Sequence, residues 1–251
     1  MFSELKLLTL AQLEKAAIDS GFDIVGGVAN NMMAFRSSQS PMKVWLGIIS
    51  TQPVVGLSMA NVVTELNRPA IHPTLGINGC EAWVAATNFV ELDRLLGRIF
   101  ALSRALPNQL LESWSKQVQT LTSTDREAVV RQRVGQDLFR EGLMALWAGR
   151  CAITGLDEPA LLRASHAKPW KDASDAERLD VYNGLLLAAH LDAAFDKGLI
   201  TVDLNGYVIP SPALSPMSLQ VLGLSNEAPI VQLRANHQRY MEWHRMHVFR
   251  K

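Results

Sequence analysis

Apolar residues recur at two spacings in the first part of the chain, one typical of helices and one typical of strands. In residues 8–20 they fall three or four positions apart, which predicts an amphipathic helix that ends at Gly21. Short apolar runs follow, separated by Gly, Asn and Pro residues that favour turns. We therefore expect strands at 22–28, 32–36 and 43–49.

Helical spacing predominates after residue 58. Pro107-Asn108 interrupts one predicted helix, and Thr124 with Glu127 three residues later forms a capping box that opens another. The second of these helices carries several arginines, which fit either a solvated face or contact with a phosphate backbone. The elements expected in this part are helices at 58–66, 88–106, 110–121 and 125–148, and a strand at 82–86.

These breaks predict an α+β protein of two domains. We expect an α+β domain at 1–106, a connecting helix or linker at 107–123 and a second domain at 124–251. A hydrophobic fraction of 48% with 19% charged residues is typical of globular proteins. We find no apolar run of about 18–20 residues and no basic stretch ahead of the first apolar segment, so we expect a cytoplasmic protein that makes no membrane contact.

Three polar residues of the second domain, His166, Asn183 and His190, stand at the ends of short apolar segments. Residues 161–165 are predicted to form a strand that ends at His166, and residues 188–195 a short helix. An imidazole that takes a proton from water, an amide that fixes its loop and a helix that binds a divalent cation are the parts of a compact one-metal nuclease.

Several motifs surround these residues in a fixed order. The chain reads Phe-Arg at 139–140, Arg-Cys-Ala-Ile-Thr-Gly at 150–155, Ala-Ser-His-Ala-Lys-Pro-Trp at 164–170, Asn-Gly-Leu-Leu-Leu at 183–187 and Asp-Ala-Ala-Phe-Asp-Lys-Gly-Leu-Ile at 192–200. In this order and spacing the chain resembles the HNH endonuclease superfamily, and more narrowly its bacterial restriction-type branch. The resemblance implies a ββα-metal domain, a β-hairpin and a helix around one metal ion, with flanking helices.

The resemblance also implies roles for individual residues. His166 corresponds to the general base, and Asn183 to the residue that braces the catalytic loop and in some members binds the metal. Counting back from the Phe of the Phe-Asp pair favours Asp192 as the helical ligand over His190, and Asp196 is either a ligand or an orienting carboxylate. The candidate catalytic residues are thus His166, Asn183 and His190, and the candidate metal ligands are Asp192, His190 and Asp196. Such ligands suit Mg²⁺ or Mn²⁺.

One residue departs from the pattern of many HNH enzymes. Ser165 stands directly before the base, where many members carry an Asp or His ligand, and this leaves the number of ligands open. Candidate DNA contacts are Arg163, Lys168, Trp170 and Lys171, with core packing an equal alternative for Trp170. The histidines near the C-terminus are expected on a surface helix that faces DNA or solvent, in preference to a second metal site.

These observations favour a metal-dependent DNA endonuclease that acts on double-stranded DNA, with residues 1–106 as a recognition domain. Recognition of a modified base and a homodimeric state are further options. The net charge of zero gives no electrostatic indication of nucleic-acid binding, so a non-catalytic DNA-binding or interaction protein on a degenerate HNH scaffold remains the alternative. The two cysteines, neither in a CxxC pair, exclude a cysteine-built zinc knuckle.

Overall fold

The computed structural model describes residues 2–72, 76–106, 109–118, 125–224 and 231–251. The chain divides into two compact units, Met1–Arg104 and Ala105–Lys251. Helices and strands occur in both, which confirms the predicted α+β class. The predicted helix break at Pro107-Asn108 and the predicted cap at Thr124 lie outside the described residues.

The first unit is built on an antiparallel sheet in which each strand pairs with the next along the chain. Two hairpin turns, Asn30-Asn31 and Ser50-Thr51, hold both of their residues at positive φ, as the commonest two-residue hairpin loops require. The strands are β1 (Ile24–Ala29), β2 (Met32–Arg36), β3 (Lys43–Ile49), β4 (Gln52–Leu57) and β5 (Ala82–Ala85). Of these, β4 was absent from the sequence prediction.

Both faces of this sheet carry buried side chains. Met32, Trp45 and Trp83 belong to a buried cluster on one face. Phe35 of β2 and Val44 of β3 are buried too, and they point to the opposite face because side chains alternate along a strand. The helix α1 packs on β3, and α2 packs on β5. The helices of this unit are α1 (Phe2–Asp19), α2 (Ala60–Leu66) and α3 (Phe89–Ala105).

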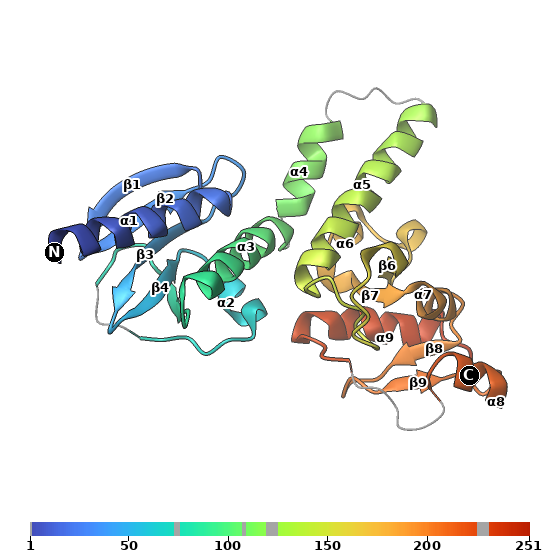
Figure 1. Cartoon of the computed structure of the whole chain (residues 1–251). Coiled ribbons are helices and arrows are strands. Elements are labelled where there is room, and N and C mark those ends of the chain that lie inside the picture. Colours follow the sequence, from blue (N-terminus) through green and yellow to red (C-terminus); the bar gives the residue numbers. More distant parts are fainter. Residues whose placement is uncertain (1, 73–75, 107–108, 119–124, 225–230) are drawn as a thin grey trace. The chain divides into compact units, whose positions relative to one another are not determined.

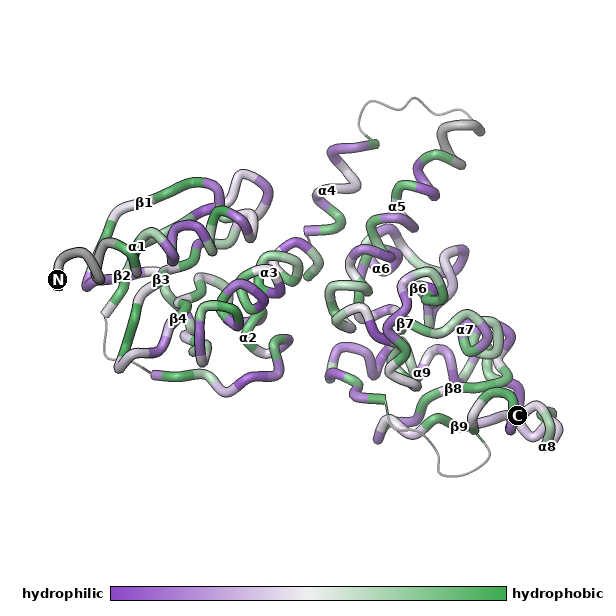
Figure 2. Tube along the Cα trace, in the orientation of Figure 1, coloured by the Kyte–Doolittle hydropathy of each residue, from purple (hydrophilic) through white to green (hydrophobic). Residues whose placement is uncertain are grey.

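The second unit begins with two helices that pack on one another, α4 (Gln109–Val118) and α5 (Asp125–Leu146). Trp114 of α4 donates its indole N–H to the carbonyl oxygen of Arg131 at 3.1 Å. Hydrophobic and hydrophilic residues alternate along α5 (Figure 2), and Phe139 is among those it buries. The structure therefore groups α4, predicted as a connecting element, with the second unit.

An antiparallel hairpin of β6 (Leu162–His166) and β7 (Gly184–Ala188) follows, and α7 (Ala189–Asp196) packs against both strands. This is the ββα arrangement expected from the sequence. The other elements are α6 (Asp175–Arg178), the hairpin of β8 (Ile200–Val202) and β9 (Val208–Pro210), α8 (Pro216–Val221) and α9 (Gln238–His247). Among the described helices, none combines the length and hydrophobicity that crossing a membrane requires.

Candidate active site

The hairpin is held in place by burial of the whole of β7. Residues 184–188 of β7 are all buried, and Gly184 pairs with His166 at the end of β6. A Cβ on Gly184 would lie 2.5 Å from the ring of Phe139 and 2.6 Å from the carbonyl oxygen of Ser165, so only glycine fits. This close contact sets the position of the end of β6, where the candidate base lies.

The His166 ring is fixed on three sides. It stacks on Phe139 with ring centroids 3.7 Å apart, and Trp170 meets it edge-on at 5.8 Å. Its Nε2 lies 2.9 Å from the carbonyl oxygen of Arg178. A carbonyl can only accept, so Nε2 donates its proton and Nδ1 carries the free lone pair. We find no hydrogen-bond partner for Nδ1 among the described residues.

Burial keeps this imidazole neutral. Loss of hydration disfavours the charged ring and lowers the pKa of His166 to about 4, against the smaller opposing effect of the Arg178 carbonyl. At neutral pH His166 is therefore in the form that accepts a proton. It lines a cleft of about 620 Å³, which gives it access to solvent.

Asn183 is fully buried and braces the loop between the two strands. Its Oδ1 accepts from the backbone N–H of Lys168 at 2.8 Å, and its Nδ2 donates to the carbonyl oxygens of Lys168 and Glu177 at 3.1 and 2.9 Å. These bonds leave the side chain no route to substrate. Of the two roles considered for Asn183, the geometry fits the brace and not a metal ligand.

Replacing this brace should destabilise the protein. We expect Asn183→Ala to lower the free energy of unfolding by about 2–4 kcal/mol, because three hydrogen bonds of roughly 0.5–1.5 kcal/mol each are lost and a backbone N–H is left unpaired. Urea unfolding followed by circular dichroism measures the change. The exposed Asn236→Ala is the matched control, and a loss of less than about 0.5 kcal/mol in Asn183→Ala would contradict the bracing role.

Two carboxylates meet a serine near the end of β6. Ser165 is buried, and its hydroxyl donates to Oδ1 of Asp196 at 3.3 Å. Burial raises the pKa of Asp192, although a hydrogen bond from Ser165 and the charge of Arg163 oppose this. Burial and the neighbouring charge of Asp192 likewise raise the pKa of Asp196. Two neighbouring carboxylates that are partly desolvated and repel each other are a typical environment for a bound cation.

His190 does not join this cluster. Its side chain is exposed, and it lies two positions before Asp192, which turns the two side chains to different sides of the helix. Within the described part of the chain, no three His, Cys, Asp or Glu side chains come close enough to share a metal ion. The group that the structure brings together is Asp192, Asp196 and the hydroxyl of Ser165. The assignment of His190 as a ligand stays a prediction.

Three oxygen-bearing side chains fit a hard divalent cation, which prefers oxygen ligands and often keeps several waters. Asp192 and Asp196 supply the negative charge, and Ser165 takes the position where many HNH enzymes carry an Asp or His ligand. The donor set therefore suits Mg²⁺ or Mn²⁺ better than a metal that prefers sulfur or several imidazoles.

The candidate DNA contacts divide into partnered and open residues. Lys168 forms an ion pair with Glu177 at 2.8 Å, and the Arg163 guanidinium donates to two backbone carbonyls of its own strand region. Both cations therefore already have partners within the protein, and their contact with DNA stays a prediction. Lys171 is exposed and lines the cleft.

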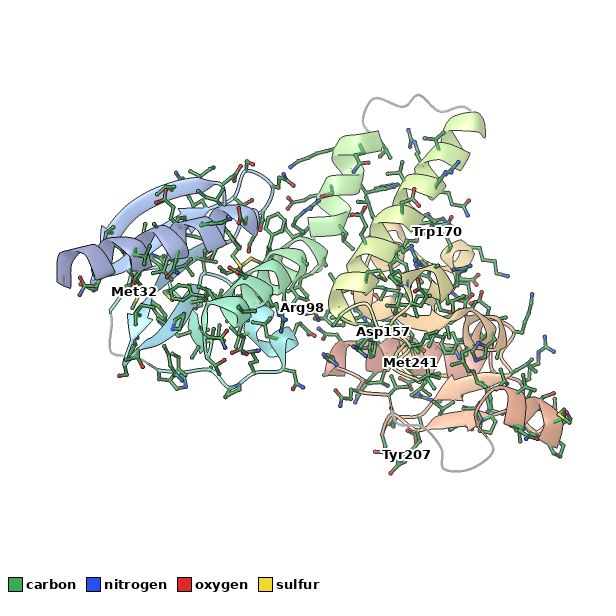
Figure 3. The ribbon with its side chains drawn as sticks, viewed as in Figure 1. Met32, Arg98, Asp157, Trp170, Tyr207 and Met241 are labelled. Carbon is green, nitrogen blue, oxygen red and sulfur yellow. The ribbon has the colours of Figure 1, made fainter. Side chains whose placement is uncertain are left out.

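Trp170 packs against a helix and also lines the cleft. Its ring packs against α5 (Figure 3), where a Cβ on Gly135 would lie 2.4 Å from the indole. Trp170 is also among the residues that line the cleft. The guanidinium of Arg178 lies over it at 5.2 Å. Trp170 therefore supports the wall next to His166 as well as forming part of its surface.

The C-terminal histidines were expected on a surface helix, and this is wrong for two of them. His237 and His244 are buried. His244 stacks on Phe195 at 3.9 Å and bonds its carbonyl oxygen through Nε2 at 3.1 Å, while Nδ1 bonds the hydroxyl of Thr201 at 2.9 Å. The spacing of His244 from the buried Tyr240 and Met241 is the signal that places it on the inner face of α9.

Residues 151–203 match the family model described as HNH endonuclease. The second unit carries an HNH domain. The match covers the hairpin, α7 and β8, and it includes the cluster around Ser165 as well as His166 and Asn183. The HNH superfamily is one of nucleases, which gives this unit a nuclease-type domain. A comparison with curated proteins gave no significant match.

Proposed function

We propose that this protein is a DNA endonuclease that requires a divalent metal and uses His166 as its general base. The observation that carries the proposal is the state of this ring: Nε2 is held by the Arg178 carbonyl, the neutral imidazole keeps a free Nδ1 lone pair, and the residue lines a cleft. Asp196, a member of the carboxylate pair, lines the same cleft. A base and a cation site that share one cleft can act on the same phosphate.

In this proposal Nδ1 of His166 removes a proton from a water molecule as the water oxygen bonds to phosphorus. The bond from phosphorus to the leaving oxygen breaks, and that oxygen takes a proton to become a hydroxyl. Asp192, Asp196 and Ser165 would hold the cation. Once bound, the cation would supply charge stabilisation at the phosphate and the leaving oxygen. By family resemblance the products carry 5′-phosphate and 3′-hydroxyl ends.

The stacked Phe139 and the Arg178 carbonyl have positioning roles in this scheme. They fix the plane of the His166 ring and the identity of the nitrogen that carries the proton. The carbonyl also stabilises the imidazolium formed when the base accepts its proton, because it remains hydrogen-bonded to Nε2–H. This hydrogen bond therefore favours the charged form of the ring when the base takes up its proton.

Plasmid nicking tests the proposal and separates it from its alternative. The wild-type chain should convert supercoiled to nicked or linear plasmid with Mg²⁺ or Mn²⁺ and should be inactive in EDTA. Plasmid binding without any metal-dependent cutting would instead favour a non-catalytic DNA-binding protein on an HNH scaffold. Modified and unmodified plasmids run side by side test the restriction-type hypothesis and any dependence on DNA modification.

We further propose that residues 1–104 form a separate module that recognises DNA. Its folding as a separate module is supported by the buried cluster that this unit builds for itself, which includes Met32, Trp45 and Trp83. Its role in recognition rests on analogy with the partner domains of HNH nucleases. A gel shift of the isolated unit with target DNA tests this role, and an absence of DNA affinity would point to a regulatory module instead. A homodimer and a cytoplasmic location remain predictions.

The packing of α4 on α5 makes a prediction about the nuclease fragment. A fragment of residues 105–251 should melt several degrees higher than one of residues 124–251, because Leu110 and Trp114 of α4 contact α5. Thermal melting of the two fragments measures the difference. Equal melting temperatures would show that α4 acts only as a connection, and Trp114→Ala in the longer fragment should reproduce part of the loss.

A further inference from the structure

The C-terminal end of the chain forms a second wall of the cleft that holds His166 and Asp196. This cleft is also lined by Trp243, His247 and Arg250. These residues follow the HNH motifs in the chain and lie outside the segment 151–203 that matches the family model. None of them has a part in the chemistry proposed above. Their position in the same cleft raises the question of what they bind.

This wall is fixed to the end of α7, the helix that carries Asp196. A Cβ on Gly198, which has φ +67°, would lie 2.0 Å from the carbonyl oxygen of Val248, so the C-terminal segment lies directly on this glycine. The backbone N–H of Arg250 donates to the Gly198 carbonyl oxygen at 2.9 Å. The buried stack of His244 on Phe195 anchors α9 to the same helix. The wall is therefore preorganised relative to the site.

The surface of the wall combines aromatic faces with positive charge. Trp243 and His247 stack with ring centroids 4.5 Å apart and planes 17° from parallel, and His247 is exposed. Arg250, Lys171 and Lys197 line the same cleft. Flat rings that take a base and cations that take phosphates are the two components of sites for unpaired nucleic acid.

The size of the cleft favours a nucleotide over a duplex. Its volume of about 620 Å³ falls in the range of roughly 300–1,000 Å³ that is typical of sites for single small molecules. One or two nucleotides fill such a space. In a duplex the base faces are covered by neighbouring pairs, so a ring can stack on a base only where that base is unpaired.

We propose that the pair of Trp243 and His247 stacks an unpaired base beside the scissile phosphate, while Arg250 holds a neighbouring phosphate. The substrate of the proposed endonuclease is then DNA with an unpaired nucleotide at the cut, as in a single strand, a flap or an extruded base. The claim that this DNA is cut rests on the proposed function. The claim that an unpaired base binds here rests only on the residues of the cleft wall.

Fluorescence anisotropy of the full chain in EDTA tests the binding. The probes are three labelled DNAs: a 12-nucleotide oligothymidine, an abasic strand of the same length and charge, and a 12-base-pair duplex. We expect the wild type to bind oligothymidine about tenfold more tightly than the abasic strand, because stacking on aromatic side chains accounts for that difference. The duplex should bind more weakly than oligothymidine.

Variants assign the preference to the wall. His247→Ala should remove most of the preference for oligothymidine over the abasic strand, whereas His247→Phe should keep it, because a phenyl ring stacks but carries no proton. Arg250→Ala should weaken binding of both strands equally. The adjacent Lys251→Ala, an exposed cation outside the cleft lining, is its matched control and should change neither.

Equal wild-type affinity for the oligothymidine and abasic strands, tighter binding of the duplex, or an unchanged preference in His247→Ala would each overturn the inference. Plasmid nicking with Mn²⁺ tests the proposed nuclease activity separately from the binding of an unpaired base. A chain that nicks plasmid but shows no base preference retains the nuclease proposal and loses the stacking wall. A chain that shows the preference but never nicks retains the wall and loses the nuclease proposal.

Discussion

Replacing His166 with alanine should lower the rate of metal-dependent DNA cleavage by about 10²- to 10⁴-fold, the contribution typical of a general base. The reason lies in the tautomer: Nε2 is occupied by the Arg178 carbonyl, so Nδ1 is the nitrogen that can take a proton from water. DNA affinity should change little, because the base acts mainly in the transition state. Cleavage under single-turnover conditions and anisotropy in EDTA measure the two effects.

A second variant separates loss of the base from loss of the structure around it. His166→Ala leaves a space beside Phe139 and an unpaired carbonyl at Arg178, so part of its effect could come from the loop. His166→Gln keeps an N–H that can donate to this carbonyl but has no basic nitrogen. Both variants should lose cleavage, and His166→Gln should melt closer to the wild type. Retained cleavage in His166→Gln would show that another group activates the water.

The position of His166 could be predicted from the sequence because the decisive information is local. A short apolar run ends at this residue, and the run of β7 after Asn183 supplies the partner strand. The bracing role of Asn183 is implied by the resemblance to HNH endonucleases, and the local pattern alone predicts only a tight turn. What fixes the tautomer could not be predicted, because the carbonyl of Arg178 is a backbone group whose location depends on the path of the loop and not on side-chain identity.

Helical spacing in the sequence predicts part of the carboxylate cluster, and the rest depends on how the helix packs in the fold. Asp192 and Asp196 are one turn apart, so their shared face follows from helical geometry. The part of Ser165 follows only from the packing of α7 on β6, which brings its hydroxyl to Asp196. His190 is a comparable ligand in the sequence because the motif order contains a histidine there, and in the structure its exposed side chain lies apart from the cluster with Ser165.

Two further errors have separate physical causes. The strand β4 was missed because the turn before it, Ser50-Thr51, adopts positive φ without the Asn-Gly or Asp-Gly residues that usually indicate such a hairpin. The buried His244 was read as a surface residue because histidine is polar, although its spacing from Met241 fits the apolar face. In both cases tertiary packing outweighs the preference of the residue type.

Removing one of the paired carboxylates should raise the stability of the metal-free protein and should reduce the stability that the protein gains on binding metal. Without metal, Asp192→Asn should raise the melting temperature, because it removes a half-buried charge that repels Asp196. Desolvation and this neighbouring charge together hold the pKa of Asp196 above its ordinary value. With Mn²⁺ in hundredfold excess over its dissociation constant, the wild type should gain about 2.7 kcal/mol of stability. Asp192→Asn and Asp196→Asn should gain much less.

Thermal melting across a series of Mn²⁺ and Mg²⁺ concentrations, together with the metal concentration for half-maximal cleavage, measures both effects. His190→Ala is the matched control on the same helix and should keep the wild-type response, because its exposed side chain lies apart from the pair. If His190→Ala instead loses the response and Asp192→Asn keeps it, the helical ligand is His190 and the cluster with Ser165 is structural. If both Asp variants bind metal normally yet fail to cut, these carboxylates orient the site without holding the cation.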